Sequence, residues 1–264
     1  GSNQAVASAR MGAETHIISK LGQDDFSKLA FDTWRKAGVI PHVQQLSSSY
    51  TGAAHIFIED STGDNAIIVA PGAATLIDIA FIHAHAALIA DSDVFVTQLE
   101  QPMDAAMCGL EIARAAGVTT VLNPAPAAIL PDGMLALCDY VTPNETECEF
   151  LTGISVRTQS QAKRACDALR DLGVGTPIIT MGEQGAFVHG HGLVPAVIAG
   201  NVIETTGAGD AFNGGFAAAL AEKRTPLDAV RYGCATAGIS VTKAGTAPSM
   251  PSRNMVDRLM RSGN

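Results

Sequence analysis

Residues 204–215 read Glu204-Thr205-Thr206-Gly207-Ala208-Gly209-Asp210-Ala211-Phe212-Asn213-Gly214-Gly215, and this stretch decides the fold that we expect. A short, partly apolar run at residues 200–203 precedes it, and residues 211–220 repeat small and apolar side chains at helical spacing, which predicts a strand-to-helix junction. The unpaired N–H groups and the positive end of a helix favour an anion there, and glycine lets the backbone approach it. The pattern therefore predicts a phosphate-binding helix start with Asp210 beside the anion.

A carboxylate at a phosphate-binding site repels the phosphate, so the presence of Asp210 there suggests a chemical role. We expect Asp210 to take a proton from a substrate hydroxyl that attacks a phosphoryl group, while backbone amides hold the charge on that group. A glycine-rich turn capped by aspartate is the alternative for Gly-x-Gly-Asp alone. Phe212 stands where a dinucleotide fingerprint needs its third glycine, and the absence of any Gly-Lys dipeptide excludes a Walker A motif.

Composition narrows the class of protein. The 264 residues are 47% hydrophobic, which is enough to bury the core of one large α/β domain with a small appendage. The formal charge of −9 disfavours a nucleic-acid partner. No apolar stretch reaches membrane-spanning length and no secretory signal pattern begins the sequence. Five scattered cysteines without a Cys-x-x-Cys pair predict reduced, mostly buried thiols of a cytoplasmic protein: Cys108, Cys138, Cys148, Cys166 and Cys234.

The order of hydrophobic patterns predicts strands that alternate with helices. A strand near residues 16–19 leads to a helix at 24–36 that Gly38 closes, and residues 44–69 are rich in β-formers and contain a hairpin with its turn at 61–64. Further strands are expected at 94–97, 119–122, 140–142 and 177–180, with the clearest helix at 160–172. Strands separated by helices indicate a parallel sheet covered on both faces, with ligands at the carboxyl ends of its strands.

The stretch from Thr205 to Gly214 resembles the second signature of the ribokinase-like carbohydrate kinases, the PfkB family. The runs Asn123-Pro124-Ala125-Pro126-Ala127 and Thr142-Pro143-Asn144-Glu145-Thr146-Glu147 resemble the middle of these kinases, and Gly1-Ser2-Asn3-Gln4-Ala5-Val6-Ala7 resembles the end of their first signature. The resemblance implies a single domain over residues 1–264, built as a three-layer α/β/α sandwich with a mostly parallel central sheet. It also implies a small β-sheet lid at approximately 42–70 and an ATP-binding half at approximately 140–264. Members of the family carry a further strand upstream, so the resemblance predicts a fold whose N-terminal strand is missing from this sequence.

The same resemblance implies an ATP-dependent sugar kinase that phosphorylates a primary hydroxyl of a pentose, with ribose to ribose 5-phosphate favoured. Asp210 would be the base, Gly207, Ala208 and Gly209 would supply the anion hole, and Asn3 and Glu100 would bind the sugar beside Asp210. Glu100 follows a predicted strand, where an ordinary loop acid or helix cap is the other interpretation. Deoxyribose, fructose, other pentoses and nucleosides stay open as substrates. A non-catalytic sugar or nucleotide sensor and, more weakly, a reductase stay open as functions.

The cofactors expected from the resemblance are ATP, Mg²⁺ and K⁺. The ATP-binding residues would be Asn144, Thr180, Gly182, Gly185, Gly207, Gly209 and Cys234, with Glu147 holding magnesium through water. Asn144 also suits a helix cap. A monovalent cation would lie at Glu204, Thr206, Gly245 and Ser249, although relatives place the shorter Asp where this chain has Glu204.

Small sugar and ATP are the partners that the resemblance implies, together with a homodimer formed through the lid. Two histidine pairs are candidate metal ligands. His83 and His85 are a poor chelating pair on a helix, and the surface loop with His189 and His191 offers no third ligand.

Overall fold

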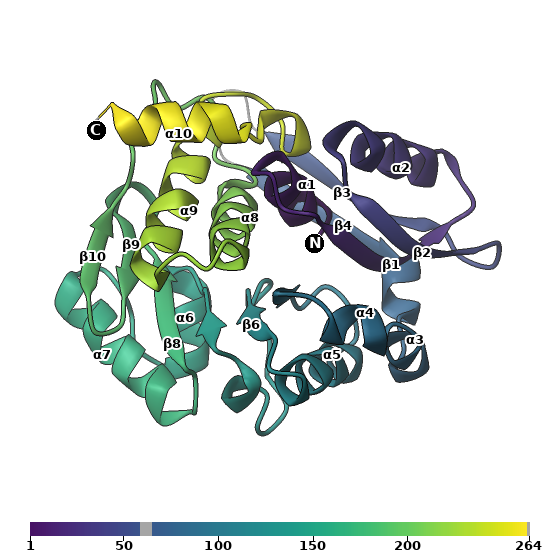
Figure 1. Cartoon of the computed structure of the whole chain (residues 1–264), viewed down its shortest axis with the longest axis horizontal. Coiled ribbons are helices and arrows are strands. Elements are labelled where there is room, and N and C mark those ends of the chain that lie inside the picture. The colour runs from purple at the N-terminus through teal and green to yellow at the C-terminus, as the bar shows by residue number, and fades with distance from the viewer. Residues whose placement is uncertain (59–64, 263–264) are drawn as a thin grey trace.

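A six-stranded sheet forms the centre of the molecule in the computed structural model, which describes residues 1–58 and 65–262 (Figure 1). Its strands are β5 (Val94–Thr97), β6 (Thr119–Leu122), β7 (Tyr140–Val141), β8 (Thr176–Thr180), β9 (Gly185–Val188) and β10 (Gly192–Pro195). They lie in the order β10-β9-β8-β7-β6-β5. Strands β5 to β8 are parallel, while β9 and β10 run antiparallel to their neighbours. The mostly parallel sheet predicted from the alternating pattern is confirmed.

Adjacent residues of the central strands point to opposite faces, because side chains alternate along a strand. Leu122 and Ile179 pack against one group of helices, while Val121 and Ile178 pack against another. The first group is α5 (Met103–Ala115), α6 (Glu145–Thr152) and α7 (Gln159–Asp171); the second is α8 (Ala208–Ala221) and α9 (Pro226–Ser240), on which α10 (Arg253–Arg261) packs. Helices therefore cover both faces, which confirms the three-layer α/β/α sandwich (Figure 1).

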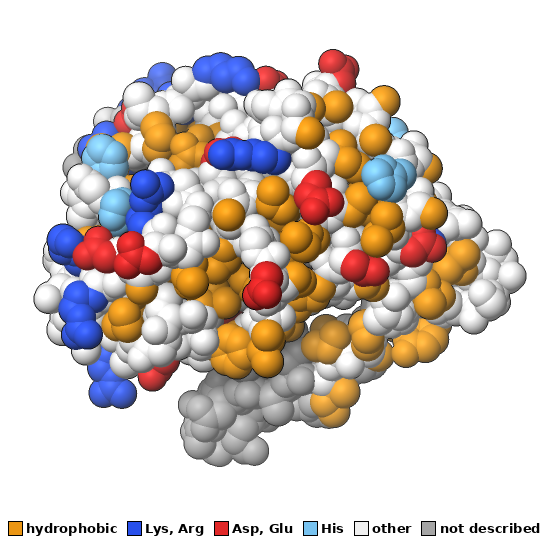
Figure 2. All heavy atoms as spheres, turned by 90° about the horizontal axis from the view of Figure 1, so that it is seen from below, with side chains coloured by type: hydrophobic (Ala, Val, Ile, Leu, Met, Phe, Trp, Pro, Cys, Tyr) orange, Lys and Arg blue, Asp and Glu red, His pale blue; other side chains and the backbone are white. Residues whose placement is uncertain are grey.

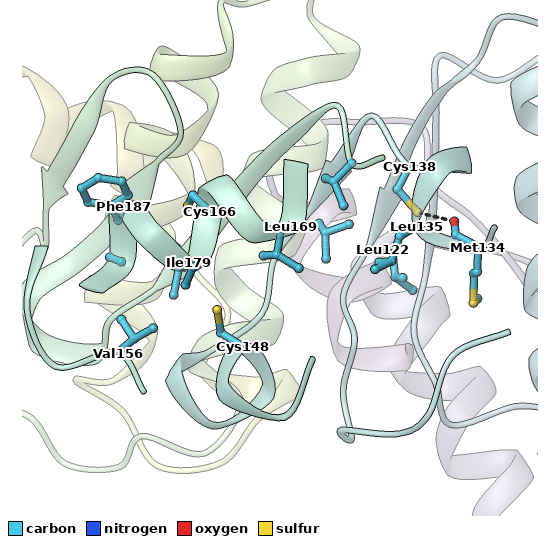
Figure 3. Close-up of a cluster of buried hydrophobic side chains, with 14 of the residues drawn as sticks. Leu122, Met134, Leu135, Cys138, Cys148, Val156, Cys166, Leu169, Ile179 and Phe187 are labelled. Atoms are coloured by element: carbon cyan, nitrogen blue, oxygen red, sulfur yellow. Dashed lines mark hydrogen bonds between the residues drawn. The ribbon is translucent and has the colours of Figure 1, made fainter. Parts of the chain in front are cut away.

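The cysteines belong to the apolar core. Figure 3 shows Cys148 and Cys166 among Leu169 and Ile179, with the Cys138 thiol donating to the Met134 carbonyl oxygen at 3.3 Å. All five cysteines are buried and free, as the sequence predicted. Burial raises the pKa of the Cys166 thiol to about 12, so this thiol stays protonated and packs as a small apolar group.

Residues 2–46 form a smaller unit with its own two-stranded sheet. Helix α1 (Ser2–Arg10) is followed by β1 (His16–Gly22), α2 (Asp25–Ala37) and β2 (Ile40–Leu46), and β1 and β2 pair in parallel. Asp24 accepts the Ser27 amide at the start of α2, and Gly38 ends the helix with a φ of 84° that glycine adopts without strain. The strand and helix predicted here are confirmed, while α1 was not predicted.

The hairpin expected within residues 44–69 is confirmed as the antiparallel pair β3 (Thr51–Ile58) and β4 (Asn65–Gly72). Its predicted turn at residues 61–64 lies outside the described residues. Residues 42–46, assigned to the lid by the sequence, belong to β2 and pair with β1 rather than with the hairpin. Two short helices, α3 (Ile79–Ala84) and α4 (Ala86–Ala90), connect the hairpin to β5.

The strand predicted at residues 200–203 was wrong, because this segment is irregular. The amides of Ile203 and Glu204 both donate to the Val241 carbonyl oxygen beyond the end of α9, at 2.8 and 3.2 Å, and no ladder forms. Val202 and Ile203 are exposed, so the apolar side chains that suggested a strand do not enter the core. Helix α8 therefore begins from a loop held against α9. None of the helices within residues 1–58 and 65–262 is long and apolar enough to cross a bilayer.

Candidate active site

The start of helix α8 has the features of an anion-binding site. Gly207 is its N-cap residue with φ of 81°, in the left-handed region where a side chain would be strained and would approach Thr246. The first amide with an intrahelical acceptor is that of Ala211, which donates to Gly207, and Ala208 donates to Thr205. No side chain of the described residues caps this helix start. The amides of Gly209 and Asp210 precede the first intrahelical donor, which is the arrangement that lets a helix start bind an anion.

Asp210 presents its carboxylate at this helix start. Its Oδ2 accepts a hydrogen bond from Asn3 Nδ2 at 2.9 Å, although the two residues are 207 positions apart. Asn3 lies in α1, so two of the residues assigned to the sugar site meet through a helix that the sequence did not predict. The pair combines a carboxylate that can accept a proton with an amide that can orient it.

Gly214 permits this meeting. A Cβ at Gly214 would overlap the Ala7 side chain and lie 2.8 Å from the Gln4 carbonyl oxygen. Only glycine therefore lets α1 lie so close to α8, and Figure 1 shows the two helices side by side. Gly215 gives α9 the same close approach on another side of α8, since a Cβ there would overlap the Thr236 side chain.

Glu100 lies in the loop after β5 with its side chain exposed. Its Oε2 is 3.2 Å from the amino group of Gly1, two residues before Asn3. The preceding residue anchors the loop, because the Leu99 amide donates to the Ala125 carbonyl oxygen at 3.0 Å. Glu100 therefore lies at the carboxyl end of the sheet, near the start of α1, as its position after a strand predicted.

Asn144 and Glu147 form a reciprocal cap at the start of α6. The Glu147 amide donates to Asn144 Oδ1 at 2.8 Å, and the Asn144 amide donates to Glu147 Oε2 at 2.9 Å. The capping role predicted for Asn144 is confirmed. Glu147 is 9% exposed, and desolvation, with a smaller contribution from Glu145, raises the pKa of its carboxyl group.

The structure brings two predicted nucleotide-binding segments together at the carboxyl end of β8. Thr180 pairs with Asn144 in an isolated parallel bridge, and its amide donates to the Pro143 carbonyl oxygen at 2.9 Å. Gly182 follows with φ of 50° in an exposed turn. Thr180 and Gly182 therefore lie on the same edge of the sheet as Asn144 and Glu147.

Gly185 and Cys234 have packing roles that explain their small size. A Cβ at Gly185 would lie 2.5 Å from the Ala196 amide nitrogen, so the absence of a side chain at Gly185 lets β10 lie this close. Cys234 is buried with Phe212, Phe216 and Val230 in the core beneath α8 and α9. Their contact with a nucleotide stays a prediction.

The residues assigned to a monovalent cation come from two loops beside the α8 start. Glu204 Oε2 accepts the Gly245 amide at 2.7 Å, which joins the loops directly. Ser249 is buried, and its hydroxyl donates to the Thr246 carbonyl oxygen at 2.7 Å. Thr206 precedes Gly207, against which the Thr246 side chain packs. The longer side chain of Glu204 thus remains at the junction of the two loops.

One histidine of each pair contacts a group outside the pair. His85 Nδ1 lies 2.8 Å from the Phe81 carbonyl oxygen, and His189 Nε2 lies 3.3 Å from Asp167 Oδ1. Within the described ranges, no three His, Cys, Asp or Glu residues are placed to hold a metal ion. Sequence reasoning missed a different pair, His16 and His42, whose ring nitrogens are 2.9 Å apart between β1 and β2.

Sequence reasoning missed a set of buried polar residues beneath the site. They are Gln4, Asn123, Thr142 and Asn213, which are connected by hydrogen bonds between side chains or to backbone oxygens. All four lie in the motifs described above, which predict no role for them. The sequence signal for such residues is a polar side chain within an apolar stretch. This signal does not identify the hydrogen-bond partners of that side chain.

Comparisons with known proteins identify the family and the fold. A family model described as pfkB family carbohydrate kinase matches residues 1–253. The chain is 42% identical over 257 residues to ribokinase from Haemophilus influenzae, covering 96% of this chain and 83% of that protein. It is 33% identical over 261 residues to deoxyribokinase from Salmonella typhimurium, covering 96% and 83% respectively. The structure of Arabidopsis thaliana ribokinase complexed with ribose and ATP superposes with a TM-score of 0.94 at 28% identity, covering 99% of this chain and 86% of that one.

Proposed function

The chain belongs to the pfkB family of carbohydrate kinases, and from this we propose that it transfers the γ-phosphoryl group of ATP to ribose, giving ribose 5-phosphate. Similarity to ribokinases over most of the chain supports the sugar and the nucleotide. The observation that carries the proposal is the Asp210 carboxylate, held by Asn3 at the amino end of α8. A carboxylate there can accept the proton of a hydroxyl group that lies beside a bound phosphate.

The reaction assigned to this site is a direct phosphoryl transfer. The primary hydroxyl oxygen of the sugar attacks the γ-phosphorus, and the bond from that phosphorus to the oxygen bridging to the β-phosphorus breaks. The hydroxyl proton passes to a carboxylate oxygen of Asp210, and ADP leaves. The helix start at Gly207, Ala208 and Gly209 stabilises the charge on the transferred group through its amides and the helix dipole.

Sugar recognition is assigned to Asn3, Glu100 and Asp210. Asn3 and Asp210 are in contact, and Glu100 is placed near the start of α1, so the three groups border one region at the carboxyl end of the sheet. Amide and carboxylate groups bind sugar hydroxyls by accepting or donating hydrogen bonds. Deoxyribose is the second candidate substrate, because a deoxyribokinase is among the relatives at 33% identity.

The nucleotide is assigned to Asn144, Thr180, Gly182, Gly185, Gly207, Gly209 and Cys234. Magnesium is assigned to Glu147 through water. The buried Glu147 carboxylate fits a hydrated cation, because a positive charge nearby offsets the desolvation and the repulsion from Glu145 that raise its pKa. When bound, Mg²⁺ neutralises charge on the ATP phosphates. The protein's own contribution here is to hold Glu147 against the α6 start, where one oxygen stays committed to the Asn144 amide.

A monovalent cation such as K⁺ is assigned to Glu204, Thr206, Gly245 and Ser249. The hydrogen bond from Gly245 to Glu204 supports this, because it draws the two loops together beside the α8 start. A cation there would rigidify the loop that leads into Gly207. We assign the protein to the cytoplasm, in keeping with its five buried free thiols.

The proposal is tested by measuring ADP release with Mg-ATP and each of ribose, 2-deoxyribose and fructose. We expect the highest kcat/KM with ribose, and faster turnover in K⁺ than in a large organic cation. Preference for deoxyribose would reassign the substrate. ATP binding by calorimetry without ADP release on any sugar would instead favour a sugar or nucleotide sensor. Equal rates in both cations would remove the potassium assignment alone.

A further inference from the structure

Four polar side chains are almost fully buried between helix α8 and the loop after β5 that carries Gln98 and Glu100, which we call the sugar-side loop. The exposed fractions are 5% for Gln4, 8% for Asn123, 1% for Thr142 and 1% for Asn213. Burying an amide or a hydroxyl is costly unless its hydrogen bonds are made, and apolar residues would fill the same space at lower cost. Their clustering beneath a reaction site therefore points to a role beyond packing.

The first half of the cluster leads from the loop after β5 to the end of β7. Gln98 Nε2 donates to Gln4 Oε1 at 2.6 Å, and Gln4 Nε2 donates to Asn123 Oδ1 at 2.9 Å. Asn123 Nδ2 then donates to the Thr142 carbonyl oxygen at 3.2 Å. Gln98 is two residues before Glu100, so the chain of hydrogen bonds begins in the loop assigned to the sugar.

The second half leads from Thr142 to the anion site. The Thr142 hydroxyl donates to Asn213 Oδ1 at 2.7 Å, and Asn213 Nδ2 donates to the Gly209 carbonyl oxygen at 2.9 Å. Every side-chain donor in the chain points toward the start of α8. Consecutive hydrogen bonds polarise one another within each half of the series, and the two halves meet at Thr142 through its backbone carbonyl and its hydroxyl.

The last bond acts on the peptide that carries an anion-hole donor. The Gly209 carbonyl and the Asp210 N–H belong to one planar peptide unit, so a group that holds the carbonyl also directs the N–H. Apart from its chain neighbours and the backbone of its own helix, no atom of the described residues lies within 4 Å of the position that a Cβ on Gly209 would take, so packing on that side does not restrain this peptide. The Asn213 side chain adds a second bond to a carbonyl in the helical turn whose amides face the ligand.

We propose that Asn213, held by Thr142, is a positioning residue that orients the Gly209–Asp210 peptide for phosphoryl transfer. Gln4 and Asn123 extend this device to the sugar-side loop at Gln98. Asn213 itself touches neither substrate. It sets the direction of the Asp210 amide and the placement of the Asp210 carboxylate. The inference rests on the proposed kinase function, since it assigns a supporting residue to that reaction.

The test is the pair Thr142→Val and Thr142→Ser, assayed with ribose and Mg-ATP. Valine keeps the shape of threonine but removes the donor to Asn213, so we expect kcat to fall about tenfold while both KM values change little. Serine keeps the hydroxyl and should restore most of kcat. The matched control is Thr120→Val near the amino end of the neighbouring strand β6, whose buried hydroxyl donates to the Leu137 carbonyl oxygen at 2.7 Å. It should lose stability and keep kcat.

The outcomes separate positioning from general stability. A normal kcat in Thr142→Val, or an equal fall in Thr120→Val, would overturn the inference. If Thr142→Val does not fold, Asn213→Ser takes its place, with the same loss of kcat expected and an unchanged kcat contradicting the proposal. A parent protein inactive on ribose and other sugars would refute the kinase function itself, which is a distinct result.

Discussion

Asp210 stands at the third helical position of α8, where its carboxylate contacts Asn3 and its amide faces the proposed phosphate. We predict that Asp210→Asn lowers kcat on ribose by about 10²- to 10⁴-fold, because the proton acceptor is lost. Asparagine keeps an oxygen that can accept the Asn3 amide, so folding and ATP binding should persist. Turnover is measured by ADP release and ATP binding by calorimetry. A near-normal kcat would refute the assignment of Asp210 as base.

Glu147 combines a capping role with a proposed magnesium role, and Glu147→Gln separates them. Glutamine can still accept the Asn144 amide, so α6 should keep its cap. The loss of charge should raise the Mg²⁺ concentration for half-maximal activity by about 10- to 100-fold, as for other groups that act on a metal through water. An unchanged magnesium requirement would show that Glu147 is only a cap.

The pH dependence of stability gives a second measure of Glu147. Its pKa is raised in the folded protein, so the folded state binds the proton more tightly than the unfolded state. This contribution is fully present below the unfolded pKa and is lost as pH rises through the folded pKa. Without magnesium, the parent protein should therefore lose more unfolding free energy over that window than Glu147→Gln. Denaturant unfolding at several pH values checks the difference.

At the scale of elements, the crossing of α1 and α8 positions the sugar site. We predict that Gly214→Ala lowers the unfolding free energy by about 1–3 kcal/mol, because the new Cβ overlaps Ala7. It should also raise the KM for ribose, since α1 carries Asn3. Denaturant unfolding and steady-state kinetics measure the two effects. Adding Ala7→Gly should recover part of both.

Gly215→Ala is the matched control for that crossing. It overpacks the same helix against Thr236 of α9, so it should cost stability with little change in the KM for ribose. If both alanine variants raised the KM equally, the position of α1 would not be what sets the sugar site.

Two of the helices that the sequence predicted carry local capping signals. Asp24 and Gly38 bracket α2 within a few residues, and the helix expected at 160–172 is α7, capped by Thr158. Helix α1 has no side-chain cap, and its buried face, with Val6 and Ala7, gains its stability from contact with distant elements. The apolar residues at 200–203 led to the opposite error, since they predicted a strand where no ladder of hydrogen bonds forms.

At the scale of the whole molecule, the β3–β4 hairpin carries apolar side chains into solvent. Ile68 is 60% and Val69 61% exposed, and adjacent residues of a strand face opposite sides. We predict that the hairpins of two copies of this chain pack against each other in a homodimer. Ile68→Glu should then shift the protein to a monomer. Light scattering should give the mass of two 27.2 kDa chains for the parent protein. A monomeric parent protein would remove the dimer proposal.

Charge is spread unevenly over the surface. In Figure 2, Lys and Arg side chains of the described residues gather mainly toward one side with Asp and Glu among them, and hydrophobic side chains occupy a central band. The face drawn there offers no continuous basic track within the described residues. The face in Figure 2 and the net charge of −9 are in keeping with an enzyme that acts on a small molecule.

The sequence alone predicted the class of this protein and the glycine-rich helix start at residues 207–210. Glycine conformations, caps and strand periodicity act over a few residues, so Gly207, Asp210 and the Asn144 cap were predicted from their neighbours in sequence. Only the tertiary structure decided that Asn3 contacts Asp210 and that Gln4, Asn123, Thr142 and Asn213 form one chain of hydrogen bonds. These contacts join residues 19 to 207 positions apart. They depend on the close crossing at Gly214 and on where the strands end, which no local preference specifies.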